Sequence, residues 1–553
     1  MKIGEKMNLI VPAWVSTRNY QSESSSKSIV ANDLDHEIVT FDDASADLWA
    51  LMVSDSDTEG YFNIEAIAAK YQAPVDEVHS FVDVLIGANL ISQNRSSEVF
   101  NDYKSNTKPK IMSSQKYAAG GYYESAPGGT NLEVENDVLE FAAKNSYLYA
   151  ATWEITYRCN ESCVHCFNPG ASHVAGDKPK RKTDELTTEE AFEFLLDLRQ
   201  SGVFRLLITG GEVFLRKDIY EILTFAKKLR FSVTLFTNGV LLNQEKVNQI
   251  RDLYITRVEM SIYSTKPEVH DAITKLKHSY RDTINAAKML NDAGLNVALK
   301  MITMKDTIND AADFTLMCDE LGVEGQVDFN MSAGVDGSNF PTNNLIPSAV
   351  DLIIKSLDSR TSLFVGEIGA PRKFDPKKLN GQRVCGAGVT LLSISPEGHI
   401  YPCNSLPIQV GNLREERVSA VWGASSVGKS ESETPSFDRL SQWQSIKRGD
   451  YDVCGTFDRC GWCQKCPGMA FLETGSELAP STVNCRNSAA RMIAYDLLKE
   501  YGTEANLHIH EGDLALKYPD ERALWETKTI QNSISLDKVK KILKERTKAK
   551  ALQ

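Results

Sequence analysis

Apolar runs and amphipathic helical patterns alternate along the middle of the chain, from about residue 146 to residue 368. Each run has the length of a buried strand, and each is followed by apolar positions spaced three and four apart. A capping box from Thr187 to Glu190 marks the start of the first helix. Six such repeats predict an α/β fold with a parallel sheet, curved or barrel-like, whose functional groups lie at the carboxyl ends of its strands. The strand candidates are YAATWEITY, FRLLITG, SVTLFTNG, RVEMSIY, NVALKMIT and GQVDFNM.

A different pattern precedes this region and predicts a small α+β domain over residues 1–100. The strand candidates NLIVPAWV, SIVAND and HEIVTFD come first, and helical stretches then begin near Ala44, Asn63 and Pro74. Pro74 suits the first turn of a helix, because its missing N–H would be unpaired there in any case. Three strands followed by three helices predict a winged-helix-like domain.

Three further regions lack these patterns. Residues 101–145 begin with a stretch rich in Gly, Ser, Lys and Pro, which is typical of a linker. From 369 to 495 the chain is rich in cysteine and glycine, with short hairpin-like pieces and too little apolar sequence for a large core. Bound metal would supply the missing stability there. Residues 496–553 are charged and helical in character, ending in LDKVKKILKERTKAKALQ.

Composition narrows the function. The chain has 553 residues, of which 42% are hydrophobic and 24% charged, with a net charge of −13. That charge argues against a nucleic-acid binder, because phosphate recognition depends on clustered Lys and Arg. No signal-peptide pattern opens the chain, and nowhere do about eighteen apolar residues run together. We therefore expect a cytoplasmic protein without a membrane segment, in which clustered cysteines bind metal rather than form disulfides.

Ten of the eleven cysteines fall into two blocks, and Cys318 stands alone at an apolar helical position, where we expect a buried thiol. In the first block, CNESCVHC, the spacing is C-x3-C-x2-C directly after a strand. A tetrahedral zinc site would need a fourth ligand, for which only His165 and His173 could be proposed. Three thiolates can instead hold three irons of a [4Fe-4S] cluster and leave the fourth iron open. The first block is Cys159, Cys163 and Cys166, and the second is Cys385, Cys403, Cys454, Cys460, Cys463, Cys466 and Cys485.

The first block resembles the fingerprint of the radical SAM superfamily, whose fold is a partial (β/α)6 barrel. In that family S-adenosylmethionine (SAM) binds the open iron, and its one-electron reduction yields a 5'-deoxyadenosyl radical. LLITGGEVFLRKDI matches the family motif that receives the SAM ammonium, at Gly210, Gly211 and Glu212. The resemblance also implies that Asn238, in LFTNG, and Ser261, in VEMSIYS, contact the ribose and the carboxylate of SAM.

The second block resembles the SPASM extension of radical SAM enzymes, which binds two auxiliary iron–sulfur clusters. Its spacing departs from the family outline, because Phe457 stands where the outline has a cysteine and Cys460 lies three places later. The resemblance implies one cluster on Cys454, Cys460, Cys463 and Cys485. It leaves Cys385, Cys403 and Cys466 for a second cluster, which then needs a non-cysteine ligand, a water or the substrate. A pair of structural zinc sites is the alternative.

The N-terminal domain resembles the precursor-recognition element of ribosomal-peptide maturases, through EIVTFDDASADLWALM, IEAIAAKY and VDEVHSFVDVLIGANLIS. In that family a leader peptide adds as a strand to the edge of the sheet. The expected edge is residues 36–42, which face the helix at 74–88. The alternative is a winged helix that only packs on the barrel or binds DNA, and its few Lys and Arg residues disfavour DNA.

Together these features favour a radical SAM/SPASM enzyme that modifies a precursor peptide, forming a thioether or carbon–carbon cross-link and taking electrons from a flavodoxin or ferredoxin. Alternatives are a sulfatase-type maturase of a larger protein, a peptide epimerase, and a non-catalytic iron–sulfur electron carrier. For a general acid or base, Asp328 and Glu259 near strand ends are weak candidates.

Overall fold

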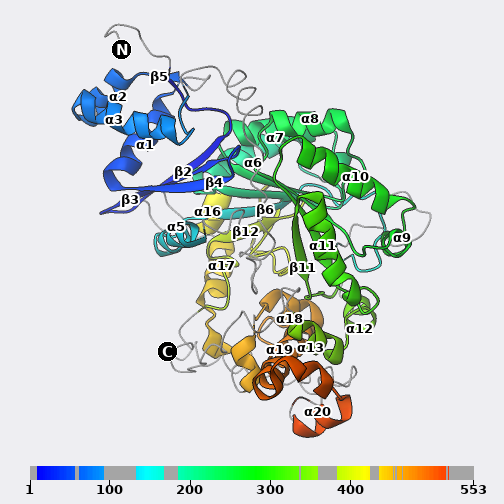
Figure 1. The fold of residues 1–553 in the computed structure, drawn as a ribbon. Helices are drawn as coiled ribbons and strands as arrows, with labels where there is room; N and C mark the ends of the chain where they lie inside the picture. Colours follow the sequence, from blue (N-terminus) through cyan, green and yellow to red (C-terminus); the bar gives the residue numbers. More distant parts are fainter. Residues whose placement is uncertain are drawn as a thin grey trace, which may run out of the picture.

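A computed structural model gives the fold (Figure 1), in which a parallel sheet with its helices lies between an N-terminal unit and a C-terminal helical region. The structure describes residues 9–56, 61–92, 132–166, 168, 185–335, 338–358, 383–423, 435–451, 454, 457–463, 465–518 and 521.

Six parallel strands form the middle of a nine-stranded sheet. Their order along the sheet is the order along the chain, from β6 to β11, as six successive strand–helix repeats require. All six predicted strands are therefore confirmed. The strands are β6 (Ala150–Glu154), β7 (Arg205–Thr209), β8 (Ser232–Thr237), β9 (Arg257–Ser261), β10 (Val297–Ile302) and β11 (Glu324–Asp328).

Helices follow the strands and cover the sheet. The predicted capping box is confirmed, with the Thr187 hydroxyl accepting from the Glu190 N–H and the Glu190 carboxylate from the Thr187 N–H. Alternate strand residues such as Leu206 and Ile208 are fully buried against apolar helix faces. The helices are α6 (Thr188–Gln200), α7 (Ile219–Lys228), α8 (Gln244–Asp252), α9 (Pro267–Thr274), α10 (Ser279–Asp292) and α11 (Ala311–Leu321).

The cysteine-rich region contains hairpin-like pieces, as the sequence predicts, but the pattern did not predict that three of its strands extend this sheet. β12 (Leu391–Ile394) pairs in parallel with β6, and β13 (His399–Tyr401) and β14 (Gly411–Asn412) continue antiparallel from it. The barrel and the cysteine-rich region therefore share one hydrogen-bonded sheet. Around it lie α16 (Val418–Trp422), α17 (Pro435–Ser445) and α18 (Pro467–Thr474).

The N-terminal unit is α+β, as predicted, but its strands differ from the prediction. The expected first strand holds only β1 (Leu9–Ile10), and β2 (Val15–Gln21) was missed because its alternation is interrupted by Arg18 and Asn19. β2, β3 (Ser26–Asn32) and β4 (Glu37–Asp42) form an antiparallel sheet, while β1 pairs with β5 (Tyr61–Phe62). The three predicted helices are confirmed as α1 (Asp43–Asp55), α2 (Ile64–Tyr71) and α3 (Val75–Gly87).

Two predicted domain limits need correction. The expected linker over 101–145 ends in a helix, α5 (Leu132–Lys144), which packs Val138 and Ala142 against the second face of the N-terminal sheet. The expected tail from 496 begins inside α19 (Thr482–Tyr501), which packs on α13 (Ala349–Leu357). The short α12 (Phe340–Asn344) and α20 (Glu511–Lys517) complete the described helices. The helix expected near the end of the chain lies outside the described residues.

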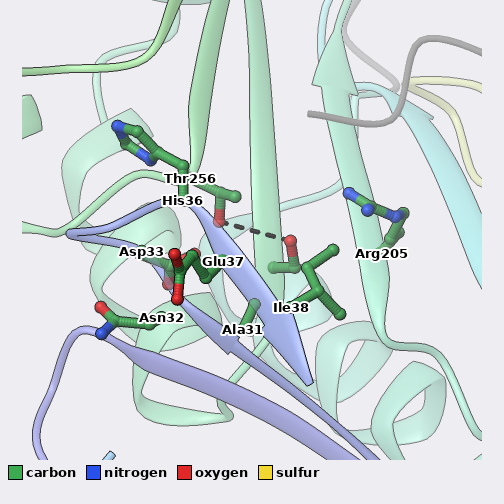
Figure 2. A pocket seen from close by; sticks show the side chains of 9 residues that line it. Ala31, Asn32, Asp33, His36, Glu37, Ile38, Arg205 and Thr256 are labelled. Atoms are coloured by element: carbon green, nitrogen blue, oxygen red, sulfur yellow. Dashed lines mark hydrogen bonds between the residues drawn. The ribbon is translucent and has the colours of Figure 1, made fainter. Parts of the chain in front are cut away.

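The N-terminal unit sits at the amino ends of the barrel strands. Lys227 at the end of α7 is buried and forms an ion pair of 2.6 Å with Asp33 of the β3–β4 turn. Figure 2 shows the adjoining cavity of about 10 Å³, room for about one water molecule, with β3 and β4 residues on one side and Arg205 and Thr256 on the other. This end of the sheet is opposite to the strand ends that carry the predicted site. None of the described helices is long and apolar enough to cross a membrane.

Lys227→Ala should loosen this docking, because it leaves the Asp33 carboxylate buried without its cation. We expect a loss of about 3–5 kcal/mol in the free energy of unfolding, measured by urea titration with tryptophan fluorescence as the signal. Lys228→Ala is the matched control, since the neighbouring Lys228 is exposed. Equal unfolding midpoints for the two variants would contradict this role for the ion pair.

Candidate functional site

The first cysteine block forms a loop that leaves the carboxyl end of β6. Cys159, Cys163 and Cys166 are each half-buried and none is disulfide-bonded. Burial, together with the charges of neighbouring Glu161, Glu212 and Cys166, raises the pKa of the Cys159 thiol to about 12. A cation in this loop would reverse that shift, because metal binding stabilises the thiolate.

The glycine pair after β7 packs against the backbone that leads into this loop. The Gly211 N–H donates to the Thr156 carbonyl at 2.8 Å, and the Glu212 N–H to the Arg158 carbonyl at 2.8 Å. A Cβ atom on Gly210 would lie 2.3 Å from the Thr156 oxygen, and one on Gly211 2.4 Å from the Arg158 oxygen. The glycines are thus required for close approach of two protein segments, next to Cys159.

The Glu212 carboxylate is fully buried and engaged by the protein. It accepts hydrogen bonds from the Phe214 N–H, the Thr237 hydroxyl and the Asn238 N–H, at 2.8 to 3.1 Å. These bonds join the end of β7 to the end of β8. In this structure the carboxylate accepts its hydrogen bonds from the protein itself. A direct contact with the SAM ammonium stays a prediction.

The other two predicted contact residues lie at neighbouring strand ends. The Asn238 amide donates to the Asn160 side-chain oxygen at 2.7 Å, which ties the end of β8 to the cysteine loop. Ser261 ends β9, and its side chain is hydrogen-bonded to that of Tyr263. Burial raises the pKa of Tyr263, as do the neighbouring Cys163 and Glu161. The predicted residues after β6, β7, β8 and β9 therefore meet around one loop.

Two residues that support this loop were not singled out from the sequence. Asn160 lies between two of the cysteines, and only its contact with Asn238 reveals its role. Arg216 is buried after the glycine pair and donates to the Ile155 carbonyl at 3.1 Å and the Leu186 carbonyl at 2.7 Å. A charged residue four positions beyond the Gly-Gly-Glu motif was the available signal. It forms an ion pair with the nearby Asp218, but the two main-chain carbonyls to which it donates lie far away in sequence.

A zinc site in the first block finds no support in the described geometry. His165 is buried, with its ring packed edge-on against Tyr263 at 4.3 Å, and His173 lies outside the described residues. Among the residues that the structure describes, no three His, Cys, Asp or Glu side chains converge on a single-ion position. The ligands of an iron–sulfur cluster do not have to converge on one point, because each thiolate binds a different iron. Three thiols on one loop fit that donor set.

The two weak acid–base candidates differ in their surroundings. Glu259 is buried in ion pairs with Arg257 at 2.7 Å and Lys300 at 2.5 Å. These cations hold the pKa of Glu259 below its usual value despite its burial. Asp328 ends β11, and burial raises its pKa while Asn330 donates to it. Asp328 therefore holds a proton more readily than Glu259 does.

The later cysteines fall into two neighbour groups. Burial, together with the neighbouring Cys466 and Cys385, raises the pKa of Cys403 to about 12. Burial also raises the pKa of Cys485 to about 12, with further contributions from Cys463, Cys454 and Cys460. The assignment of these cysteines to two clusters stays a prediction.

Two family models match these regions. The Radical SAM superfamily matches residues 153–317, and SPASM, described as an iron–sulfur cluster-binding domain, matches residues 385–467. Residues 153–317 are a radical SAM domain. The predicted fold class, a radical SAM α/β sheet followed by a SPASM domain, is confirmed, and so is the prediction of an enzyme that uses SAM.

Individual proteins resemble the chain more distantly. The AdoMet-dependent heme synthase of Methanosarcina barkeri is 24% identical over 346 residues, 59% of this chain and 93% of the relative. The mycofactocin maturase MftC of Mycolicibacterium smegmatis is 26% identical over 329 residues, 56% of this chain and 77% of the relative. Among solved structures, Streptococcus suis SuiB bound to precursor peptide SuiA has a TM-score of 0.48 and 15% identity, covering 86% of this chain and 99% of that chain.

Gly211→Ala should displace the cysteine loop, because the added methyl group would overlap the Arg158 carbonyl. We expect a stability loss of about 1–3 kcal/mol and less iron bound after anaerobic reconstitution, measured by thermal unfolding and iron analysis. Gly87→Ala is the control, since a Cβ there meets open space. If Gly211→Ala kept the iron content and melting temperature of the parent, the close packing would not position the loop.

Proposed function

We propose that this enzyme modifies a ribosomally made precursor peptide by abstracting a hydrogen atom from one of its residues. The observation that carries the proposal is the combination of an incomplete cysteine set at the barrel strand ends with a separate N-terminal sheet, whose strand β4 pairs on one side only among the described strands. With a [4Fe-4S] cluster and SAM bound, the site would supply a 5'-deoxyadenosyl radical. The MftC relative, named a maturase, supports the same reading.

This chain's residues would perform distinct tasks around that chemistry. Cys159, Cys163 and Cys166 would hold the cluster, while the Gly210–Glu212 segment fixes the start of their loop. Asn238 and Ser261 would contact SAM from the next two strand ends.

The later cysteines would hold two auxiliary clusters, one on Cys385, Cys403 and Cys466 and one on the other four. Forming a closed-shell cross-link after hydrogen abstraction requires one further electron to leave the substrate. An auxiliary cluster can accept that electron, and a flavodoxin or ferredoxin would supply the reducing electron for SAM. The shared sheet, in which β12 pairs with β6, supports placing this acceptor close to the barrel.

The N-terminal sheet offers β4 as the edge for a leader peptide. The outer edge of β2 is covered, since the Thr17 N–H donates to the Arg230 carbonyl and the Arg199 guanidinium donates to the Thr17 carbonyl. Among the described strands β4 pairs only with β3. A strand added to β4 would lie between α3, where Phe81 contacts Phe41 at 5.6 Å, and α5.

Charge complementarity indicates a basic leader. Residues 9–56 and 61–92 contain twelve Asp and Glu against three Lys and Arg, a net charge of −9. On α3, Asp76, Glu77 and Asp83 are exposed. Lys or Arg residues in the leader would speed association and help to fix its register on this surface.

The leader edge and the cysteine loop lie at opposite ends of the barrel strands. Arg205 begins β7 at the N-terminal unit, and Gly210 follows the same strand at the loop. Five strand residues span about 17 Å. The recognised and modified parts of the precursor must therefore be separated by at least about five extended residues, and by more on a path around the helices.

The heme synthase relative raises a second candidate, radical modification of a small molecule. Its match covers only 59% of this chain, and a small-molecule enzyme has no need of a peptide-binding edge. A sulfatase-type maturase has no need of a leader-binding domain either.

Mass spectrometry of the peptide encoded beside the gene, after co-expression, separates a cross-link, with loss of about two hydrogens, from epimerisation, which leaves the mass unchanged.

Replacing Cys159, Cys163 and Cys166 together by alanine should abolish SAM cleavage. The measurement is 5'-deoxyadenosine formed by the anaerobically reconstituted protein with dithionite, which should fall to background while about eight auxiliary irons remain bound. Cys318→Ala is the matched control, because Cys318 is buried in α11 away from both blocks. Parent-level cleavage by the triple variant would overturn the proposal.

Val84→Asp on α3 should weaken precursor binding by about tenfold or more, because Val84 is 66% exposed and lies one turn from Phe81 beside the β4 edge. The measurement is fluorescence anisotropy with the labelled peptide encoded beside the gene. Val75→Asp is the control, since Val75 is 41% exposed on the other side of α3. Equal affinities for both variants would place the leader elsewhere.

A further inference from the structure

A basic turn lies directly against the first cysteine loop. The turn, residues 275–278, joins α9 to α10 on the outer side of the barrel (Figure 1). The N–H groups of the residues on either side of Cys163 donate to the Thr274 and Ile273 carbonyls, at 3.0 Å each. These two residues end α9, so one hydrogen bond and one residue separate the backbone beside a predicted cluster ligand from the turn.

The backbone of this turn has a fixed shape. Lys275 and His278 both adopt the left-handed conformation, with φ of 55° and 70°, which is uncommon for residues other than glycine. The Asp271 carboxylate holds the end of the turn by accepting from the Ser279 hydroxyl at 3.0 Å and from the Tyr280 N–H at 2.9 Å. The points from which the side chains of the turn leave the backbone are therefore fixed relative to the cysteine loop.

The charge of this segment is opposite to that of the whole chain. Residues 272–281 contain Lys275, Lys277 and Arg281 and no Asp or Glu, whereas the chain has a net charge of −13. Arg281 pairs with the neighbouring Asp282 at 2.8 Å. Both lysines are exposed, and within the part of the chain that the structure describes neither ammonium has an acidic partner. The turn thus presents two positive charges to solvent beside the cysteine loop.

A surface in this place suits a protein that delivers electrons. Each reductive cleavage of SAM takes one electron from a donor, and electron transfer slows steeply with distance, so the donor has to dock close to the cysteine loop. Complementary charge raises the rate of encounter and fixes the orientation of two proteins. A basic docking surface therefore fits an acidic donor. The acidic surface proposed for the leader lies at the other end of the barrel strands, so leader and donor would not compete.

We propose that the turn carrying Lys275 and Lys277 is the docking surface for an acidic one-electron carrier protein. The carrier loses one electron, which passes to the cluster in the first cysteine loop and then breaks the bond between the sulfur and C5' of SAM, giving methionine and the radical. The two ammonium groups hold the carrier at the point where the cysteine loop is nearest to the turn. This inference rests on the radical function proposed above.

Reversing both charges tests the surface by binding. The variant combines Lys275→Glu with Lys277→Glu, and anaerobic isothermal titration calorimetry on the reconstituted protein gives its Kd for a flavodoxin and, in a parallel arm, for a ferredoxin, both of net negative charge. For the carrier that binds the parent, Kd should rise about tenfold or more, because like charges then face each other. Lys228→Glu with Lys288→Glu is the matched control, since both residues are exposed, lie away from the turn and give the same change of charge.

SAM cleavage separates docking from chemistry. Dithionite is a small reductant that needs no docking surface, so 5'-deoxyadenosine formation with dithionite should be the same in the double Glu variant and the parent. Formation driven by the reduced carrier, at a carrier concentration below the Kd of the parent, should fall about tenfold in the double Glu variant and stay unchanged in the control.

The outcomes distinguish the two levels of the argument. Absence of dithionite-driven cleavage by the parent overturns the proposed function, and the docking surface with it. If the parent cleaves SAM with dithionite but binds neither carrier, or if the double Glu variant and the control have equal Kd values, the docking surface alone is overturned.

A neutral variant decides the case in which charge reversal also removes dithionite-driven cleavage. Lys275→Gln combined with Lys277→Gln should then bind the carrier more weakly than the parent while it cleaves SAM with dithionite at the parent rate. An unchanged Kd for this variant, or a loss of its dithionite-driven cleavage, would show that the lysines support the loop rather than dock the carrier, and would overturn the proposal.

Discussion

The candidate site depends on one close contact, the packing of the glycine pair after β7 against the backbone that leaves β6. Two main-chain hydrogen bonds join the segments. Because neither glycine has a Cβ atom, the two backbones approach more closely than any other residue would allow. Because the contact involves the three residues immediately before Cys159, it fixes where the cysteine loop starts. The Glu212 carboxylate links this contact to the end of β8 by accepting a hydrogen bond from the Asn238 N–H. The Asn238 side chain in turn donates to Asn160 in the loop.

The remaining parts of the chain are placed relative to that site by the sheet. β12 continues the barrel sheet beyond β6, so the cysteine-rich domain is attached by backbone hydrogen bonds rather than by side-chain packing alone. The N-terminal unit docks at the other end of the strands, through the buried Lys227–Asp33 ion pair and the Arg230 guanidinium. Chemistry would thus lie at the carboxyl ends of the barrel strands, substrate recognition at their amino ends, and electron acceptance beside the β6 edge of the sheet.

Local patterns were sufficient for much of this arrangement. The six barrel strands, the Thr187 capping box and the three N-terminal helices follow from apolar periodicity and capping residues, which act over a few positions. The cysteine spacing identified the loop because ligands on one short segment must lie close together.

β2 was missed since Arg18 and Asn19 interrupt its alternation, and α5 was assigned to a linker because the preceding Gly- and Ser-rich stretch suggested one. The pairing of β12 with β6 joins residues more than two hundred positions apart, and neither strand carries a signal for its partner. The same holds for Asn160 and Arg216, whose roles depend on contacts distant in sequence.

The central claim is that the cluster in the first cysteine loop keeps one iron open for SAM. The most direct test is electron–nuclear double resonance on the reduced, reconstituted protein with SAM labelled by 17O in the carboxylate and 15N in the amino group. The account predicts hyperfine coupling from both labels to a four-iron cluster, lost when Gly211→Ala displaces the loop. A cluster signal with no coupling to either label, in protein that retains all three loop cysteines, would contradict it.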